Sequence, residues 1–300
     1  MEMNMKKTLL ISLLTVCVIA GCSKDGTQGS SLPLKDNVIY VTAEINEPLT
    51  RAGYDADNLD EFALMIRNRS NSLYTYNKKM IGAGSSWSAE DGELMIWDAE
   101  RTPVDVIALA PYVETYFDGI VSTSANFDQS VADNVKASDF LLMKSQVNPD
   151  SDLVDGKLKI SLDHLMSKLS VKLTVDGNPA DMSKVSGMSI NGVLLDGSCN
   201  LSEDTPEVRP VEDAVKTMVT PYKSDDAYEC ILIPQTVADG ISVNFMYDGK
   251  LYVWESENNI SLKKAVEHIL TLNIVTTKAQ KTMIQAYRLE TVSLADDIRR

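Results

Sequence analysis

Histidine is scarce in this sequence, with 2 among 300 residues, His164 and His268. Neither has a ligand-like spacing to a cysteine, so we expect no metal site. The Gly-Ala-Gly at residues 82–84 lacks the third glycine, the strand–helix context and the downstream acid of a dinucleotide site. His164 follows Asp163, but no Gly-x-Ser-x-Gly elbow or similar setting surrounds it. These absences predict a protein that is not an enzyme and that uses no cofactor.

Cysteine is also scarce, and the 4 cysteines do not form a disulfide framework. Cys17 lies inside an N-terminal apolar run and Cys22 lies directly after it, which leaves Cys199 and Cys230. These two could form one disulfide in an oxidising compartment, but their geometry does not follow from the sequence. The alternative, two buried free thiols, is slightly favoured.

Basic residues are outnumbered, since 28 lysines and arginines stand against 43 aspartates and glutamates, for a net charge of −15. Residues 1–51 hold five residues of each sign, so residues 52–300 carry the whole acidic excess. An acidic surface repels the phosphates of nucleic acid, which we therefore exclude as a partner. The charge suits a protein that faces the outside of the cell.

No apolar run is long enough to span a bilayer. The longest candidate, residues 9–20, follows Lys6 and Lys7 and ends in Ala-Gly before Cys22. At about 1.5 Å per residue it falls short of the roughly 30 Å hydrocarbon core. A basic start, a short apolar run and small residues are typical of a secretory signal peptide, here residues 1–21. The final residues resemble the lipobox of bacterial lipoproteins, in which the cysteine receives a diacylglyceryl anchor and becomes the first residue of the exported chain.

Residues 22–51 read as a tether followed by a strand and a loop. Residues 23–33 are rich in glycine, serine and polar side chains, as flexible linkers are. Residues 38–45 are β-branched and partly alternating, which predicts a strand. A polar loop containing Pro48 and Arg51 follows. This arrangement suggests a segment that can be cut away.

Beyond residue 52 the chain consists of short apolar runs separated by turn residues, with little sustained helical periodicity. Asp248-Gly249, between two alternating runs, predicts a hairpin. Many short strands with frequent turns are typical of β-sandwiches, and the length favours two of them. We therefore predict an all-β chain with β-sandwich domains at 52–156 and 157–276, divided near Asp155-Gly156.

The last segment, residues 277–300, forms a tail beyond the last clear strand. Its principal apolar residues are Met283, Ile284, Tyr287, Leu289, Val292 and Leu294. Met283, Tyr287 and Leu289 would share one face of a strand. Ala286, Leu289 and Val292 would equally share one face of a helix. The sequence leaves helix and strand open here.

Five segments, in this order along the chain, resemble the fimbrillin family, the subunits of type V pili and related surface lipoproteins. They are residues 49–52 (LTRA), 103–112 (PVDVIALAPY), 138–142 (SDFLL), 164–173 (HLMSKLSVKL) and 233–235 (IPQ). Each alone is a weak signal, whereas the ordered set, together with the lipobox, covers most of the chain.

The resemblance implies two tandem transthyretin-like β-sandwich domains, export as a lipoprotein and assembly after proteolysis. A trypsin-like protease would cut after Arg51, which makes Ala52 the new N-terminus. The tail, about residues 278–294, would be the donor strand that enters the groove of a neighbouring subunit. This head-to-tail contact generates an open filament. The implied partners are other pilus subunits, including copies of this chain, and the outer membrane through the lipid before processing.

Among the roles in a cell-surface pilus we expect a stalk subunit, because the tail exists to be donated. A tip subunit would keep its tail on its own second domain, and an anchor subunit would keep its lipid and stay uncut at Arg51. A different class, a surface glycan-binding lipoprotein, requires exposed aromatic side chains among Trp87, Trp97 and Trp254. The adhesion target and the identity of the protease do not follow from the sequence.

Overall fold

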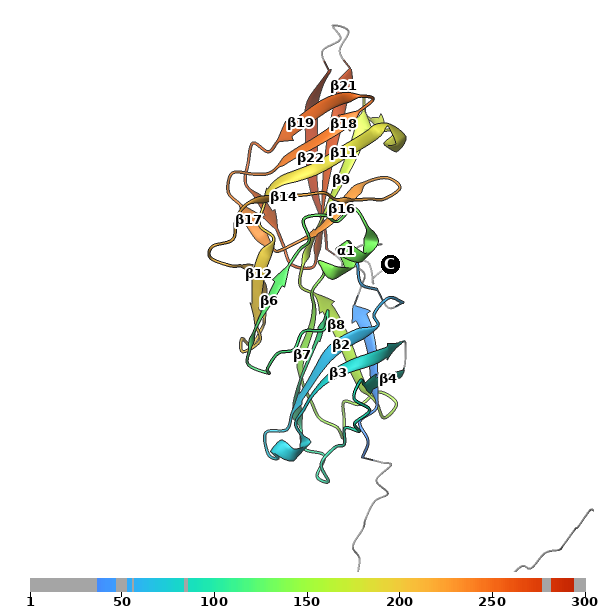
Figure 1. Cartoon of the computed structure of the whole chain (residues 1–300), viewed down its shortest axis with the longest axis vertical. Helices are drawn as coiled ribbons and strands as arrows, with labels where there is room; N and C mark the ends of the chain where they lie inside the picture. The colour runs from blue at the N-terminus through green and yellow to red at the C-terminus, as the bar shows by residue number, and fades with distance from the viewer. Residues whose placement is uncertain (1–36, 47–52, 56, 84–85, 277–281, 294–300) are drawn as a thin grey trace, which may run out of the picture. The chain divides into compact units, whose positions relative to one another are not determined.

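The protein is all-β, as its sequence predicts (Figure 1). The residues that the computed structural model describes are 37–46, 53–55, 57–83, 86–276 and 282–293. Within them, strands dominate, and the helices are α1 (Ala132–Ala137), η2 (Ser72–Tyr74) and η3 (Met182–Lys184). In the part of the chain so described, no helix has the length and apolar character needed to cross a membrane.

Seven strands close into a barrel in the order β1-β4-β3-β2-β5-β7-β8. They are β1 (Val41–Asn46), β2 (Glu61–Arg67), β3 (Tyr76–Ala83), β4 (Ser86–Ala89), β5 (Val104–Ala110), β7 (Leu141–Val147) and β8 (Leu158–His164). All neighbours are antiparallel except β1 and β8, which are parallel. The sequence predicted a β-sandwich domain in this region. Because β1 pairs with both β4 and β8, the sheet closes on itself instead.

The other strands form four further sheets. Their orders are β15-β16-β9-β21-β22 with β10 beside β9, β14-β11-β18-β19, β13-β12-β6, and β17-β20. The strands are β6 (Ile120–Ser124), β9 (Ser167–Val175), β10 (Asn178–Pro179), β11 (Val185–Val193), β12 (Asp196–Asn200), β13 (Val208–Pro210), β14 (Thr217–Val219), β15 (Tyr222–Lys223), β16 (Tyr228–Leu232), β17 (Gln235–Val237), β18 (Ser242–Tyr247), β19 (Lys250–Glu255), β20 (Ile260–Leu262), β21 (Val266–Thr276) and β22 (Thr282–Ser293).

The hairpin predicted at Asp248-Gly249 is confirmed. β18 and β19 pair from Ser242 opposite Glu255 to Tyr247 opposite Lys250, which leaves a two-residue turn. Both turn residues have positive φ, 48° for Asp248 and 76° for Gly249. This geometry is that of a type I′ turn, which matches the twist of the strands that it joins.

Asp155-Gly156, where we expected the domain boundary, forms a turn of the same kind. Asp155 has φ 51° and Gly156 has φ 76°, and Val154 and Lys157 exchange two backbone hydrogen bonds around them. β8 follows this turn and belongs to the barrel, whereas β6, from the first half of the chain, pairs with β12. The sheets therefore do not divide at residue 156.

Two clusters of buried side chains make the core. One fills the barrel and includes Phe62 and Leu64 of β2. The other joins β9, β11, β16, β18 and β21 and also takes in Ala63 and Met65, the alternate residues of the same strand. β2 thus buries both faces, which explains why its middle residues form a continuous apolar run rather than an alternating one.

Candidate functional site

The segment around β1 packs one alternating face into the barrel. Ile39 and Val41 are buried, and Ala43 and Ile45 pack against the same cluster. Tyr40, between the first two, is 48% exposed. Successive side chains of a strand point to opposite faces, so one apolar face of this segment covers the barrel interior.

Backbone hydrogen bonds hold this segment on both sides. On one side, residues 41–46 pair in register with residues 158–163 of β8, which lies beside the blue β1 strand in Figure 1. On the other side, the N–H of Ile39 donates to the carbonyl of Met95 over 2.9 Å, and Val41 lies opposite Trp87 of β4. β1 is therefore a central strand, although it comes first in the chain.

Polar side chains on the outer face of β1 contact β8. The Glu44 carboxylate accepts from Lys159 Nζ at 2.7 Å and from Ser161 Oγ at 2.9 Å. The hydrogen bond from Lys159 is the largest factor, and with Ser161 it lowers the pKa of Glu44 despite some desolvation. The Asn46 amide donates to Asp163 Oδ1 over 2.9 Å. Sequence reasoning missed these pairs, because residues over a hundred positions apart give no local signal.

The predicted processing residues Cys22, Arg51 and Ala52 lie outside the described residues. Just beyond them the chain is firmly anchored. Tyr54 is 4% exposed, and Lys136 Nζ of α1 lies 5.0 Å from the centre of its ring. Burial and nearby carboxylates raise the pKa of the Tyr54 phenol. The next residues form a tight turn, in which Asp55 Oδ1 accepts from the N–H of Asn58 over 2.9 Å.

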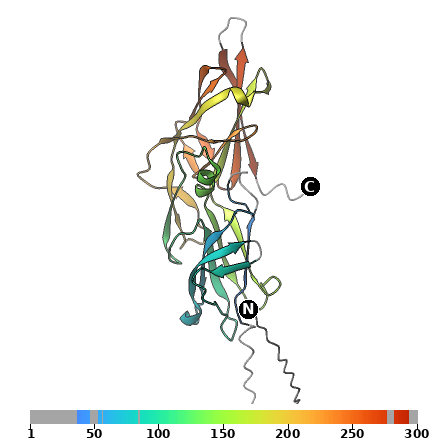
Figure 2. The same ribbon diagram turned by 45° about the vertical axis from the view of Figure 1, so that its right-hand side comes forward.

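In the C-terminal tail, residues 282–293 form a strand, β22, which settles the choice between helix and strand for these residues. β22 pairs antiparallel with β21 along its whole length, and Figure 2 shows these two red strands side by side. A bulge lies where Asn273 and Ile274 face Ala286 and Ile284, so Gln285 is an extra residue. Because of the bulge, Ile284, Tyr287 and Leu289 lie opposite Ile274, Leu272 and Leu270, which are alternate residues of β21.

The predicted donor residues are distributed along β22. Ile284 packs against the core cluster of β9 and β21, and Leu289 is 37% exposed. Met283 lies opposite Val275, Tyr287 opposite Leu272 and Val292 opposite Glu267 in the register. Leu294 lies outside the described residues. β22 is the last strand of its sheet, so in the described residues the sheet pairs it with β21 on one side.

The three tryptophans do not form an exposed platform. Trp87, Trp97 and Trp254 are 8%, 4% and 7% exposed. The exposed coplanar aromatics that the glycan-binding alternative requires are therefore missing at these positions.

Cys199 and Cys230 are buried free thiols, which is the alternative that the sequence favoured. Burial raises the pKa of Cys199 to about 11 and raises that of Cys230 further. A thiol with a raised pKa is a poor nucleophile, so neither has the environment of a catalytic cysteine.

The two histidines are buried and have structural partners. His164 Nδ1 lies 2.8 Å from Asp139 Oδ2, and His268 Nε2 accepts the backbone N–H of Lys263 over 2.9 Å. Burial, with a smaller contribution from the Lys263 charge, lowers the pKa of His268 to about 4. In the described ranges no group of three His, Cys, Asp or Glu side chains could hold a metal ion.

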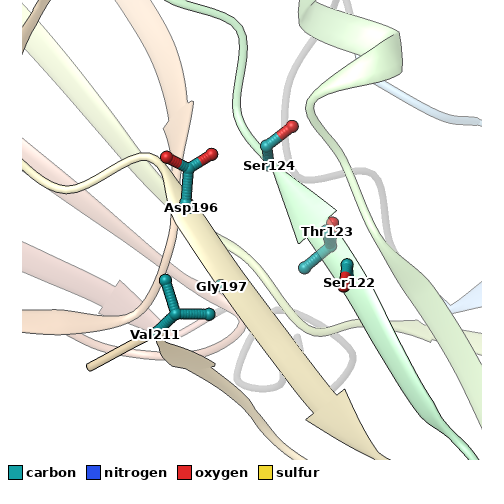
Figure 3. A pocket seen from close by; sticks show the side chains of 6 residues that line it. All are labelled: Ser122, Thr123, Ser124, Asp196, Gly197 and Val211. Carbon is teal, nitrogen blue, oxygen red and sulfur yellow. The ribbon is translucent and has the colours of Figure 1, made fainter. Parts of the chain in front are cut away.

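A surface depression lies over β6 and β12 (Figure 3). Its volume is about 280 Å³. The lining residues are Ser122, Thr123, Ser124, Asp196, Gly197 and Val211. The serines and threonine come from β6, and Asp196 and Gly197 come from the neighbouring strand. With Asp196 as its one charged side chain, this surface does not present the converging groups of a catalytic site.

Comparison with known proteins relates the chain to fimbrial subunits. A family model described as fimbrillin-like matches residues 50–286. A Bacteroides uniformis protein named as a candidate fimbrium subunit, Fim1C, is 22% identical over 281 residues, which are 90% of this chain and 90% of that protein.

Solved structures share the fold, among them two from Bacteroides species. One is a candidate cell adhesion protein from Bacteroides ovatus, with a TM-score of 0.62 and 15% identity, covering 85% of this chain and 95% of that one. The other is a candidate cell adhesion protein from Bacteroides uniformis, with a TM-score of 0.59 and 16% identity, covering 86% and 98%. At these identities the likeness shows the fold alone.

Proposed function

This chain belongs to the fimbrillin-like family of fimbrial subunits, and we propose on that premise how its precursor is converted into a filament subunit. The precursor is exported as a lipoprotein and held at the outer membrane through Cys22. A trypsin-like protease then cuts after Arg51 and releases residues 22–51. The processed body, which begins at Ala52, polymerises by head-to-tail strand addition into a pilus at the cell surface.

The observation that carries this proposal is the position of β1. It is a central strand of the barrel, yet it precedes the expected cut and Tyr54 is anchored just after it. Cleavage between them would free β1 while the rest of the barrel keeps its contacts. Burying Ile39 or Val41 contributes about 1.5–3 kcal/mol each. Losing β1 would therefore leave an apolar groove with unpaired backbone groups along β8, which favours the entry of another strand.

β22 suits the role of the donor. In its own chain it has a ladder to β21 on one side, as the last strand of its sheet. In the groove of a neighbour it would have partners on two sides, as β1 has. Contacts on a second side, which for β1 are the Val41–Trp87 pair and the bond from Ile39 to Met95, support the exchange of an edge position for a central one. Because donor and groove lie on different parts of the chain, each subunit offers both, and the contact generates an open filament.

For the processed body we infer two domains, divided by sheet rather than at residue 156. The first is the barrel without β1, which the cut removes. The second contains β6 and β9 to β22, and its sheets with β9 and with β11 enclose one cluster that includes Leu169, Ile190 and Phe245. Two sheets around one core support the transthyretin-like sandwich that we expected for residues 157–276. The barrel is the corresponding domain for residues 52–156, with β8 added.

A tip role is the second candidate, and the pairing of β22 with its own β21 favours it. A tip subunit accepts a strand but donates none, so its tail stays in place. The stalk role, which we prefer because β22 would gain partners on a second side, requires β22 to leave β21 before assembly. The two roles therefore predict different fates for β22 in assembled material.

The test is mass spectrometry of the mature N-terminus in filaments isolated from the cell surface. We expect Ala52 as the first residue, and we expect Arg51→Ala to abolish both the cut and the filaments. Arg51→Lys is the matched control, because a trypsin-like protease also cuts after lysine. Filaments whose subunits keep a lipidated Cys22 would contradict processing.

A further inference from the structure

Lys159 and Ser161 form a polar pair on β8, beside the outer face of β1. Both side chains contact Glu44, Lys159 Nζ at 2.7 Å and Ser161 Oγ at 2.9 Å. Lys159 and Glu44 are 40% and 44% exposed, so the pair lies at the surface rather than in the core. A cation beside a hydroxyl donor is a recognition site for a carboxylate.

This polar pair loses its acidic partner, Glu44, if β1 leaves. The apolar face of the groove accepts any strand with alternating hydrophobic residues, because burial of apolar area is not directional. The polar pair adds a charged contact at one register position, which burial of apolar area does not provide. Exposed ion pairs contribute little affinity, but they discriminate between partners and between registers.

We propose that Lys159 and Ser161 select the incoming strand by a carboxylate at the position of Glu44, and that Glu290 of a second copy of this chain supplies it. This inference rests on the proposed strand addition and names its specificity. Glu290 is the one acidic residue of β22. Aligning it with Glu44 places Leu289 at the position of Ala43 and Tyr287 at that of Val41. Apolar residues then fill the two middle inner positions and the acid the outer one, while Gln285 and Thr291 take the places of Ile39 and Ile45.

The same alignment fixes direction and register. β1 runs parallel to β8, with Thr42 opposite Lys159 and Glu44 opposite Ser161. A strand shifted by two residues would keep its apolar face inward but would move its carboxylate by about 7 Å. In the matched register Arg288 takes the place of Thr42, next to Lys159. Two like charges directly opposite each other are destabilising, so the Glu290 carboxylate is needed to offset this pair.

The experiment measures binding of a labelled peptide with the sequence of residues 283–293 to the full chain after cleavage at Arg51 and removal of the released segment. Replacing Glu290 by Lys in the peptide should weaken binding by about tenfold or more, because a third cation replaces the acid. Lys159→Glu in the protein should weaken binding of the wild-type peptide and restore binding of the Glu290→Lys peptide. Lys172→Glu is the matched control, since Lys172 is also 40% exposed and pairs with Asp226 on a different sheet.

The outcomes distinguish the charge selection from strand addition itself. If the wild-type peptide binds and Glu290→Lys binds equally well, strand addition stands and the charge selection is overturned. If the Lys159→Glu protein does not bind the Glu290→Lys peptide, Lys159 does not recognise the carboxylate. If no peptide binds the cleaved protein, strand addition of β22 itself fails. Because the donor variants are peptides, misfolding of a variant cannot account for their effect.

Discussion

The backbone N–H of Tyr54 donates to Oδ2 of Asp139 over 3.4 Å. This bond ties the residue three positions after Arg51 to the segment between α1 and β7. The same carboxylate oxygen lies 2.8 Å from His164 Nδ1 at the end of β8. The start of the proposed processed chain is thus held at the end of the strand that pairs with β1, and removal of β1 would not release it.

Replacing Tyr54 by alanine should destabilise the protein. The side chain is 4% exposed, and truncating a buried aromatic residue costs about 3 kcal/mol or more. Urea unfolding of the uncleaved chain measures the change. Tyr116→Ala is the matched control, because Tyr116 is 80% exposed and its loss should change the free energy of unfolding by about 0.5 kcal/mol or less. Equal effects of the two variants would contradict the anchoring role of Tyr54.

A carboxylate placed on the inner face of β1 should expel the strand from the barrel. Val41 is 3% exposed, and an unpaired charge at this position would cost several kcal/mol if β1 stayed in place. We expect Val41→Asp to make the chain sensitive to limited proteolysis before residue 53. Thr42→Asp, on the outer face next to Lys159, should remain as resistant as wild type. Resistance of Val41→Asp would argue against β1 as the seal of the barrel.

Stability should fall on acidification because of His268. Its pKa is about 4 in the folded chain and 6.5 ordinarily, so the unfolded chain binds more protons between these values. The contribution of this residue is fully present above pH 6.5 and is lost progressively as the pH falls toward 4. The full difference corresponds to about 3 kcal/mol.

The pH effect can be isolated by substitution. Protonation of His268 Nε2 removes its ability to accept the N–H of Lys263, whereas a glutamine offers an amide oxygen that does not titrate in this range. Free energies of unfolding at pH 7 and pH 5 should therefore differ less for His268→Gln than for wild type. An unchanged pH dependence in this variant would place the titration on other groups.

A disulfide between β21 and β22 should distinguish a stalk from a tip subunit. Thr271 and Arg288 are opposite each other in the register, and opposite residues of antiparallel strands lie within the Cα separation that a disulfide spans. Oxidised Thr271→Cys/Arg288→Cys should block polymerisation if β22 is donated, and reduction should restore it. Single-cysteine variants are the controls. Polymerisation that proceeds with the disulfide intact would favour the tip role, in which β22 stays on its own domain.

The sequence by itself determined the class of structure and the positions of turns between strands. Short β-branched runs separated by Asp-Gly and Asn-Gly pairs predicted an all-β protein, because strand periodicity and turn chemistry are local properties. The hairpin at Asp248-Gly249 follows from two adjacent residues that tolerate positive φ. The ordered motifs predicted the family, and the family match over residues 50–286 confirms it.

Only the tertiary structure decided which strands lie next to each other. Asp155-Gly156 looks in the sequence like a domain boundary, yet it is a tight turn that leads β8 into the barrel. The extra residue Gln285 shifts the alternation of β22, and no sequence period reveals a bulge. Glu44 meets Lys159 because β1 and β8 are paired in parallel across more than a hundred residues. Such pairings depend on the packing of the whole chain, which no local pattern of residues encodes.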